Sequence, residues 1–184
     1  MATTLDQVGA LLLEAARLCN HRNFVIAGSL CVLGSILRPP EDMVLSRDVD
    51  LYPKLDPGRG FEEIARELAQ GSAFAREHGV YADPISPQLL SLPEGWEARL
   101  IPVPLPGGVV AWFLDPNDAA IGKLMRGEDN DLRWCRAGMR EGILSLPVVQ
   151  ERLRTVARAL PEDFERARAS MALLQQPNGD PGAS

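Results

Sequence analysis

The sequence predicts an α/β (α+β) fold, with a small mixed β-sheet, flanking helices and a helical C-terminal segment. Two observations lead to this prediction. Short apolar or alternating runs, which are typical of strands, lie between amphipathic runs up to residue 114, whereas the later patterns are helical. The chain also has 184 residues, 46% of them hydrophobic, which is enough to bury a core without disulfides.

The first elements follow from the spacing of apolar residues and from the residues that interrupt it. Spacings of three and four predict an initial amphipathic helix. A continuously apolar run follows as a buried strand, and Pro39 stops the short helix after it. Polar and apolar residues then alternate up to Pro53, as in a strand. In order, these elements are a helix (Leu5–Cys19), a strand (Phe24–Ala27), a short helix (Leu30–Leu37) and a strand (Arg47–Tyr52).

The middle of the chain predicts a helical stretch, a short strand and a hairpin. The helical pattern is interrupted at Gly71-Ser72, so we expect either one broken helix or two short ones. Prolines make residues 84–95 a loop, and Pro106-Gly107-Gly108 forms the turn of the hairpin. These elements are the helical stretch Phe61–His78, a strand at 79–83, and hairpin strands within Trp96–Leu105 and Val109–Leu114.

The last third of the chain is predicted to be helical. Pro116 and the carboxylates around it favour a helix start, because proline fits the first turn and the helix dipole favours negative charge there. We expect helices at 117–125, 131–139, 147–159 and 161–174. The chain then divides into a core (1–114), a helical segment packed on it (115–174) and a disordered tail (175–184).

Composition excludes several classes of protein. Lys plus Arg number 19 and Asp plus Glu number 25, so the net charge is −6 and no duplex DNA partner is expected. There is no apolar run of membrane-spanning length and no signal-peptide pattern, so we expect no membrane partner. The three cysteines are scattered, which is typical of reduced thiols and favours a cytoplasmic location.

Two short motifs carry the chemistry. Gly28-Ser29 lies between an apolar strand and a helix, where glycine allows close backbone approach and free N–H groups favour phosphate. Asp48 and Asp50 are two residues apart on a strand, so their carboxylates point to one face. Carboxylates placed together repel unless a cation lies between them, and Mg²⁺ prefers such oxygen ligands together with substrate phosphates.

In this order the motifs resemble the DNA polymerase-β-type nucleotidyltransferase superfamily, and in particular a small bacterial branch of predicted nucleotidyltransferases of unknown substrate. The resemblance covers most of Leu5–Pro161. The matching stretches are residues 28–35, 46–53, 92–100 and 114–118, and Lys123-Leu124 with Asp131-Leu132.

The resemblance implies a metal-dependent transfer of a nucleoside monophosphate from a nucleoside triphosphate to a hydroxyl acceptor. Asp48 and Asp50 would be catalytic and hold Mg²⁺ or Mn²⁺, and Gly28 and Ser29 would contact the phosphates. A third carboxylate would help to activate the acceptor. Glu97 is the preferred candidate for it and Asp83 is the alternative.

Lys123 has two interpretations. It could bind a phosphate of the nucleotide, or it could pair with Asp118 or Asp131. The branch has a basic segment after its Lys-Leu, whereas this chain has the acidic Glu128–Asp131, which we expect to weaken nucleotide binding.

Three functions stay open at this point. The preferred one is the nucleotidyltransferase, whose acceptor could be RNA, a protein or a small molecule. Some small bacterial relatives are toxins, so the resemblance also allows an antitoxin partner. The second is a catalytically degenerate nucleotidyltransferase fold that binds a partner or ligand. The third is a small domain whose aspartates only face water.

Overall fold

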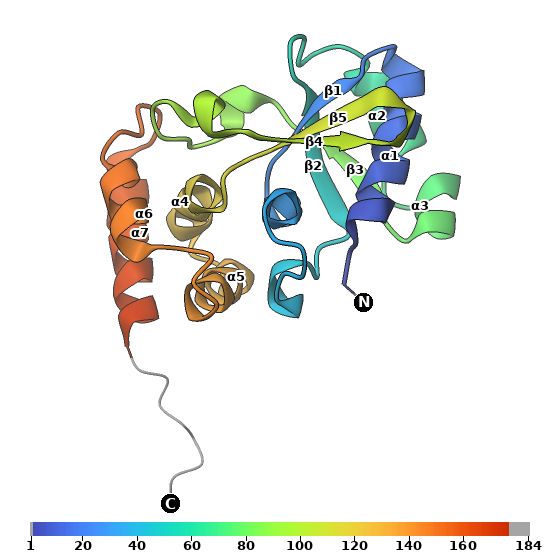
Figure 1. Cartoon of the computed structure of the whole chain (residues 1–184). Coiled ribbons are helices and arrows are strands. Elements are labelled where there is room, and N and C mark those ends of the chain that lie inside the picture. Colours follow the sequence, from blue (N-terminus) through green and yellow to red (C-terminus); the bar gives the residue numbers. More distant parts are fainter. Residues whose placement is uncertain (1, 177–184) are drawn as a thin grey trace, which may run out of the picture.

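The computed structural model describes residues 2–176 and contains one five-stranded mixed sheet (Figure 1). The strand order is β3-β2-β1-β5-β4. Strand β1 pairs antiparallel with β2 and parallel with β5, β2 pairs parallel with β3, and β4 and β5 form an antiparallel hairpin. The predicted α/β class is therefore confirmed. The strands are β1 (Asn23–Ile26), β2 (Asp48–Pro53), β3 (Tyr81–Pro84), β4 (Ile101–Leu105) and β5 (Val109–Phe113).

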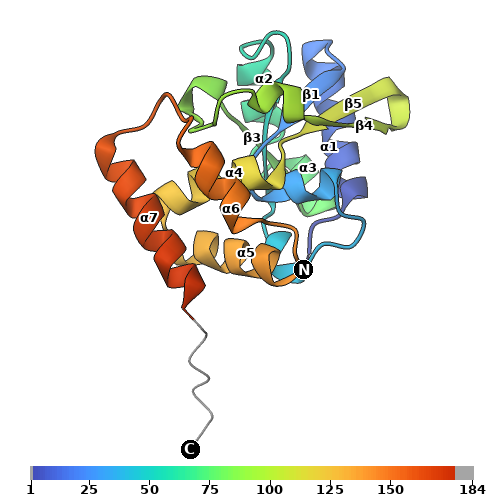
Figure 2. The ribbon, with the colours of Figure 1, turned by 60° about the vertical axis from the view of Figure 1, so that its left-hand side comes forward.

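Helices cover both sides of the sheet. The N-terminal helices α1 (Leu5–Cys19), α2 (Phe61–Glu67) and α3 (Ala73–His78) lie on one side (Figure 1). The C-terminal helices lie on the other and pack against one another, with α4 in contact with each of the other three (Figure 2). These helices are α4 (Pro116–Arg126), α5 (Asp129–Arg140), α6 (Leu146–Leu153) and α7 (Pro161–Gln175).

Local sequence explains the best-defined helix. Thr4 accepts a hydrogen bond from the Gln7 backbone N–H, and the Gln7 side chain accepts one from the Thr4 N–H, which is a capping box. The helix ends at Asn20, which adopts the left-handed conformation that asparagine tolerates. Its apolar stripe is buried in a core shared by the sheet and the helices on both sides. The predicted bounds Leu5–Cys19 are confirmed.

Two expectations about elements need correction. The helix expected at Leu30–Leu37 is a 3₁₀ helix, Ser29–Gly34, and a side chain at Gly34 would overlap Phe113 of β5. The stretch Phe61–His78 forms two short helices, which is one of the two alternatives that the sequence left open. Helix α6 ends at Leu153, earlier than expected, because Val156 leaves the helix to bridge Pro93.

The proposed division of the chain at residue 114 stays a prediction. Helix α7 reaches Gln175, so the first residue of the expected tail 175–184 is helical, which corrects that expectation. Residues 177–184 lie outside the described part. Within that part, no helix is both long enough and apolar enough to cross a bilayer.

A buried aspartate ties the C-terminal helices to the segment before β4. The Asp118 side chain is fully buried on α4. It accepts a hydrogen bond from Arg99 Nε at 2.8 Å and another from Arg152 at 2.8 Å, and Arg152 also reaches Asp115 at 2.8 Å. Both arginines are only about a quarter exposed, so these ion pairs are poorly screened.

We predict that Asp118→Ala destabilises the protein by about 3 kcal/mol, because it leaves two partly buried guanidinium groups without their partner. Chemical denaturation of the two proteins measures the change. Glu67→Ala is the control, since the exposed Arg66–Glu67 pair contributes little. Equal losses for both variants would contradict a structural role for the buried pairs.

Candidate active site

The Gly28-Ser29 turn lies directly against β2. Ala27 N–H donates to the Asp50 carbonyl at 3.0 Å, continuing the β1–β2 pairing beyond the last residue of β1. Gly28 has φ 59° and ψ −149°, a conformation that favours glycine. A side chain at this position would also overlap the Asp50 carboxylate. The expected adjacency of the turn and the aspartate strand is therefore confirmed.

Three carboxylates converge on the same face of the sheet. Asp48 and Asp50 are two residues apart on β2, and Asp83 on β3 is the register partner of Asp50. One carboxylate oxygen from each of the three lies within 4.8 Å of the others. Ser46 Oγ donates to Asp48 Oδ1 and orients that side chain.

The charges of these carboxylates are poorly compensated. The pKa of Asp50 is raised to about 6, chiefly by burial and then by the charges of Asp48 and Asp83. Burial also raises the pKa of Asp83, and the Asp48 charge adds to the effect. Three carboxylates this close together offer oxygen ligands of the kind that a hard divalent cation prefers, and such a cation would offset their mutual repulsion.

Lys123 lies on the other side of the Gly-Ser turn. Its side chain is buried, and Nζ donates to Ser29 Oγ at 2.8 Å and to Asp131 Oδ1 at 3.0 Å. Arg126 donates two hydrogen bonds to the same carboxylate, at 2.8 and 2.9 Å. Burial alone would raise the pKa of Asp131, but the hydrogen bond from Arg126 and the Lys123 charge lower it.

These contacts decide part of the question about Lys123. Its carboxylate partner is Asp131 and not Asp118, which binds the two arginines described above. Because Lys123 also contacts Ser29 at the rim of the cleft, pairing with Asp131 and proximity to a phosphate are compatible. Within the acidic segment 128–131, Asp131 is the residue that reaches the site: it forms ion pairs with Lys123 and Arg126 beside the turn.

Glu97 is not part of the carboxylate group. The sequence favoured it because it was expected on a hairpin strand, but Trp96–Arg99 is a 3₁₀ turn and β4 begins only at Ile101. The Glu97 side chain is exposed and lines a different cavity, with Trp96 and Arg158. Asp83, the alternative, is the carboxylate that the structure brings to Asp48 and Asp50.

A cleft of about 480 Å³ joins these parts. The turn and the aspartates of β2 form its floor, and α4 and α7 contribute cations to its wall. Arg166 of α7 is one of these, and no local sequence pattern marks it, because its role depends on the packing of α7 against α4. Residues that line the cleft include Gly28, Ser29, Asp48, Asp50, Lys123 and Arg166.

Comparison with family models gives one match, and it covers nearly all of the described chain. Residues 5–173 match the family described as "Nucleotidyltransferase of unknown function (DUF6036)". The chain belongs to this family. The resemblance to nucleotidyltransferases is thereby confirmed, while the bacterial branch stays a prediction. No curated protein matches the chain, and no solved structure matches it.

We predict that Asp50→Asn stabilises the protein without added metal near neutral pH by up to about 3 kcal/mol. The raised pKa means that the folded protein holds this proton more tightly than the unfolded chain does. Ionisation of Asp50 therefore lowers stability as the pH rises from about 4 through about 6. Denaturation in EDTA should show a large difference at pH 7.5 and a small one at pH 5. A difference that is independent of pH would contradict this account.

We predict that Gly28→Ala weakens Mn²⁺ binding, because the new methyl group displaces the Asp50 carboxylate. Gly142→Ala is a matched control. It also has a positive φ, 69°, but an added side chain there has open space around it. Gly142→Ala carries backbone strain of about 1 kcal/mol, and Gly28→Ala carries about 1–3 kcal/mol because φ 59° and ψ −149° form a conformation essentially restricted to glycine. Calorimetric titration should show weaker Mn²⁺ binding for Gly28→Ala only. An equal loss of Mn²⁺ affinity in both variants would contradict the steric explanation.

Proposed function

We propose that the protein transfers a nucleoside monophosphate from a nucleoside triphosphate to a hydroxyl acceptor, with Mg²⁺ or Mn²⁺ held by Asp48, Asp50 and Asp83. The single observation that carries this proposal is the convergence of the three carboxylates beside the Gly28-Ser29 turn. Membership of a nucleotidyltransferase family supports the same kind of reaction.

The turn would hold the phosphates of the nucleotide. Ser29 Oγ accepts a hydrogen bond from Lys123, so its own proton is free to point elsewhere and donate to a phosphate oxygen. Arg126 and Arg166 line the same cleft and supply positive charge near that position. Gly28 keeps this part of the cleft free of side-chain atoms, which allows close approach of the phosphates.

The transfer itself is a displacement at the α-phosphorus. The acceptor oxygen forms a bond to that phosphorus while the bond to the oxygen that bridges the α- and β-phosphates breaks, and pyrophosphate leaves with the electron pair. Asp83 accepts the proton of the acceptor hydroxyl, since it is the more exposed carboxylate on the edge strand β3. The bound cations would stabilise the charge on the attacking and leaving oxygens.

A degenerate binding module is the second candidate, and one observation favours it. Asp131 neutralises part of the charge of Lys123 and Arg126, the two cations nearest the turn. The complete set of three carboxylates favours the enzyme, because a module without turnover has no need to keep the destabilising Asp50 charge.

The two candidates predict different thermal melts. We predict that millimolar Mg²⁺ with a nucleoside triphosphate raises the melting temperature of the wild type, since ligands of the folded state stabilise it. Asp50→Asn should lose most of this rise and all release of pyrophosphate. Asp56→Asn, the same chemical change on an exposed loop outside the cleft, is the control and should behave as the wild type.

An equal rise in melting temperature for the wild type and for Asp50→Asn would contradict the metal site. Metal-dependent stabilisation without pyrophosphate release, across several classes of hydroxyl compound, would instead support the degenerate module.

A further inference from the structure

One wall of the cleft is formed by a segment that crosses the molecule. Residues 85–99 leave the sheet at β3 and reach the C-terminal helices, as the green connection in Figure 1 shows. Ile85 N–H donates to Leu51 O at 3.0 Å, which anchors the start of the segment beside β2. Its far side is held by the bridge between Pro93 and Val156. The segment is therefore held at its start and at its middle, and its last residue, Arg99, donates to Asp118.

This crossing segment presents apolar side chains to the cleft. Leu89 is 82% exposed, so most of its surface is available for contact. Ile85, Leu90 and Leu92 are partly buried against the core and line the cleft with it. The cleft thus has an apolar wall beside its carboxylates.

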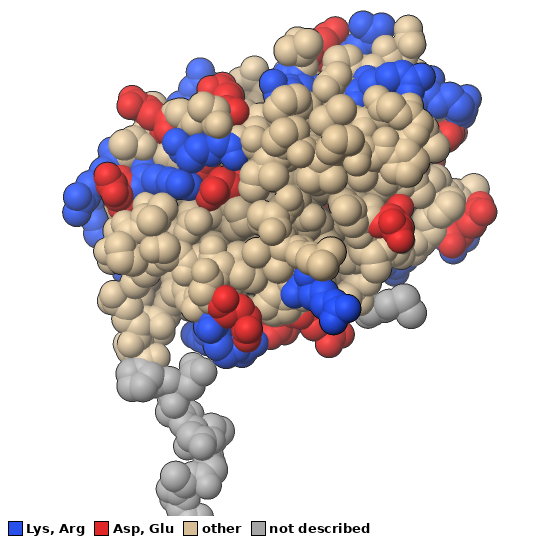
Figure 3. Space-filling view, in the orientation of Figure 1, with Lys and Arg blue, Asp and Glu red and all other residues tan. Residues whose placement is uncertain are grey.

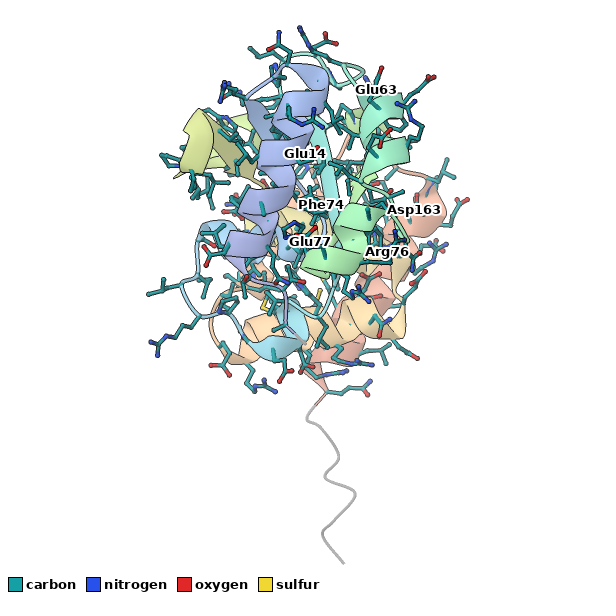
Figure 4. All side chains as sticks on the ribbon, turned by 90° about the vertical axis from the view of Figure 1, so that its right-hand side faces the viewer. Glu14, Glu63, Phe74, Arg76, Glu77 and Asp163 are labelled. Carbon is teal, nitrogen blue, oxygen red and sulfur yellow. The ribbon has the colours of Figure 1, made fainter. Side chains whose placement is uncertain are left out.

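The crossing segment carries no Lys or Arg before its last residue, Arg99. The sequence contains no Lys or Arg from residue 77 to residue 98. Arg76, just before this range, lies on α3 (Figure 4), and Arg99, just after it, is bound to Asp118. The cations of the cleft are Lys123, Arg126 and Arg166, and all of them come from α4 and α7.

The two walls therefore suit different ligands. The helical wall, with its cations and the Gly-Ser turn, suits the phosphates of the nucleotide. The crossing segment, which is apolar and lines the cleft together with Asp48 and Asp50, offers nothing to a second polyanion. On the face drawn in Figure 3, Lys and Arg lie mostly near the edges, among Asp and Glu.

The position of Asp83 indicates that the acceptor binds against the crossing segment. A general base lies within hydrogen-bond reach of the proton it takes, so the acceptor hydroxyl lies at Asp83. Ile85 is two residues further along the chain, and Leu89 follows in the next turn. The body of an acceptor held at Asp83 consequently extends over these side chains.

Resting on the proposed function, we infer that the acceptor is a hydroxyl compound with an apolar body and a neutral or positive charge, bound against Leu89, Leu90 and Leu92. Its oxygen forms the new bond to the α-phosphorus, its proton passes to Asp83, and pyrophosphate leaves. A nucleic acid 3′ end would place phosphates beside the carboxylates with no cation on that wall.

Three phenols with tails of similar size and different charge test this inference. Tyramine is cationic, tyrosol is neutral and 4-hydroxyphenylacetate is anionic. Each is incubated with the protein, Mg²⁺ and α-³²P-labelled nucleoside triphosphates, and a short oligoribonucleotide with a free 3′ hydroxyl is tested in parallel. We expect tyramine and tyrosol to be labelled at least about tenfold faster than the anion or the RNA, because like charges are opposed at this wall.

Leu89→Lys changes the wall without touching the carboxylates or the turn. It should reduce the preference for tyramine over 4-hydroxyphenylacetate by about tenfold, because it adds a cation where the tail lies. Leu55→Lys is the matched control, since Leu55 is 79% exposed on a loop outside the cleft and should leave the preference unchanged.

The outcomes separate this inference from the proposed function. Mg²⁺-dependent binding of a non-hydrolysable triphosphate is measured first by calorimetry, and its absence would overturn the proposed function. With that binding intact, preferential labelling of the RNA or of the anionic phenol, labelling that ignores charge, or no labelling of the phenols would overturn the acceptor class.

Discussion

The close packing of Gly28 against the Asp50 carboxylate is the contact on which the rest of the site depends. It is possible only because residue 28 has no side chain and accepts a positive φ. The contact brings the turn after β1 over the strand that carries two of the aspartates, and it fixes where Ser29 begins its 3₁₀ helix. Ser29 in turn accepts a hydrogen bond from Lys123, which connects the sheet to α4. A single small residue thus links the acidic and basic halves of the cleft.

The two halves differ in how their charge is balanced. On the sheet, burial and then the charges of Asp48 and Asp83 raise the pKa of Asp50, and the opposing charges of Lys123 and Arg126 do not offset this rise. On the helices, Asp131 binds both Lys123 and Arg126, so the cations are held in place by a counterion before any substrate arrives. A magnesium–nucleotide complex matches this asymmetry, because its metal meets the unbalanced carboxylates and its phosphates meet the prearranged cations.

Local patterns predicted much of this arrangement, and long-range pairing accounts for what they missed. The alternation around Asp48 and Asp50 was enough to place both on one face, and the glycine after an apolar run marked the turn. The choice between Glu97 and Asp83 depended on the pairing of β2 with β3, whose residues are more than thirty positions apart. Nothing in the sequence near Glu97 shows that a 3₁₀ turn delays the start of β4. Arg166 enters the cleft only because α7 packs on α4, and the early end of α6 reflects a bridge to Pro93.

The most direct test of the central claim is the position of a bound metal in crystals of the protein grown with Mn²⁺ and a non-hydrolysable nucleoside triphosphate. An anomalous difference map identifies manganese independently of the protein density. The account predicts a peak among the carboxylates of Asp48, Asp50 and Asp83, next to the phosphates at the Gly28-Ser29 turn, and its loss in Asp50→Asn. Well-defined nucleotide without a manganese peak at the three carboxylates, or manganese bound elsewhere in the cleft, would contradict it.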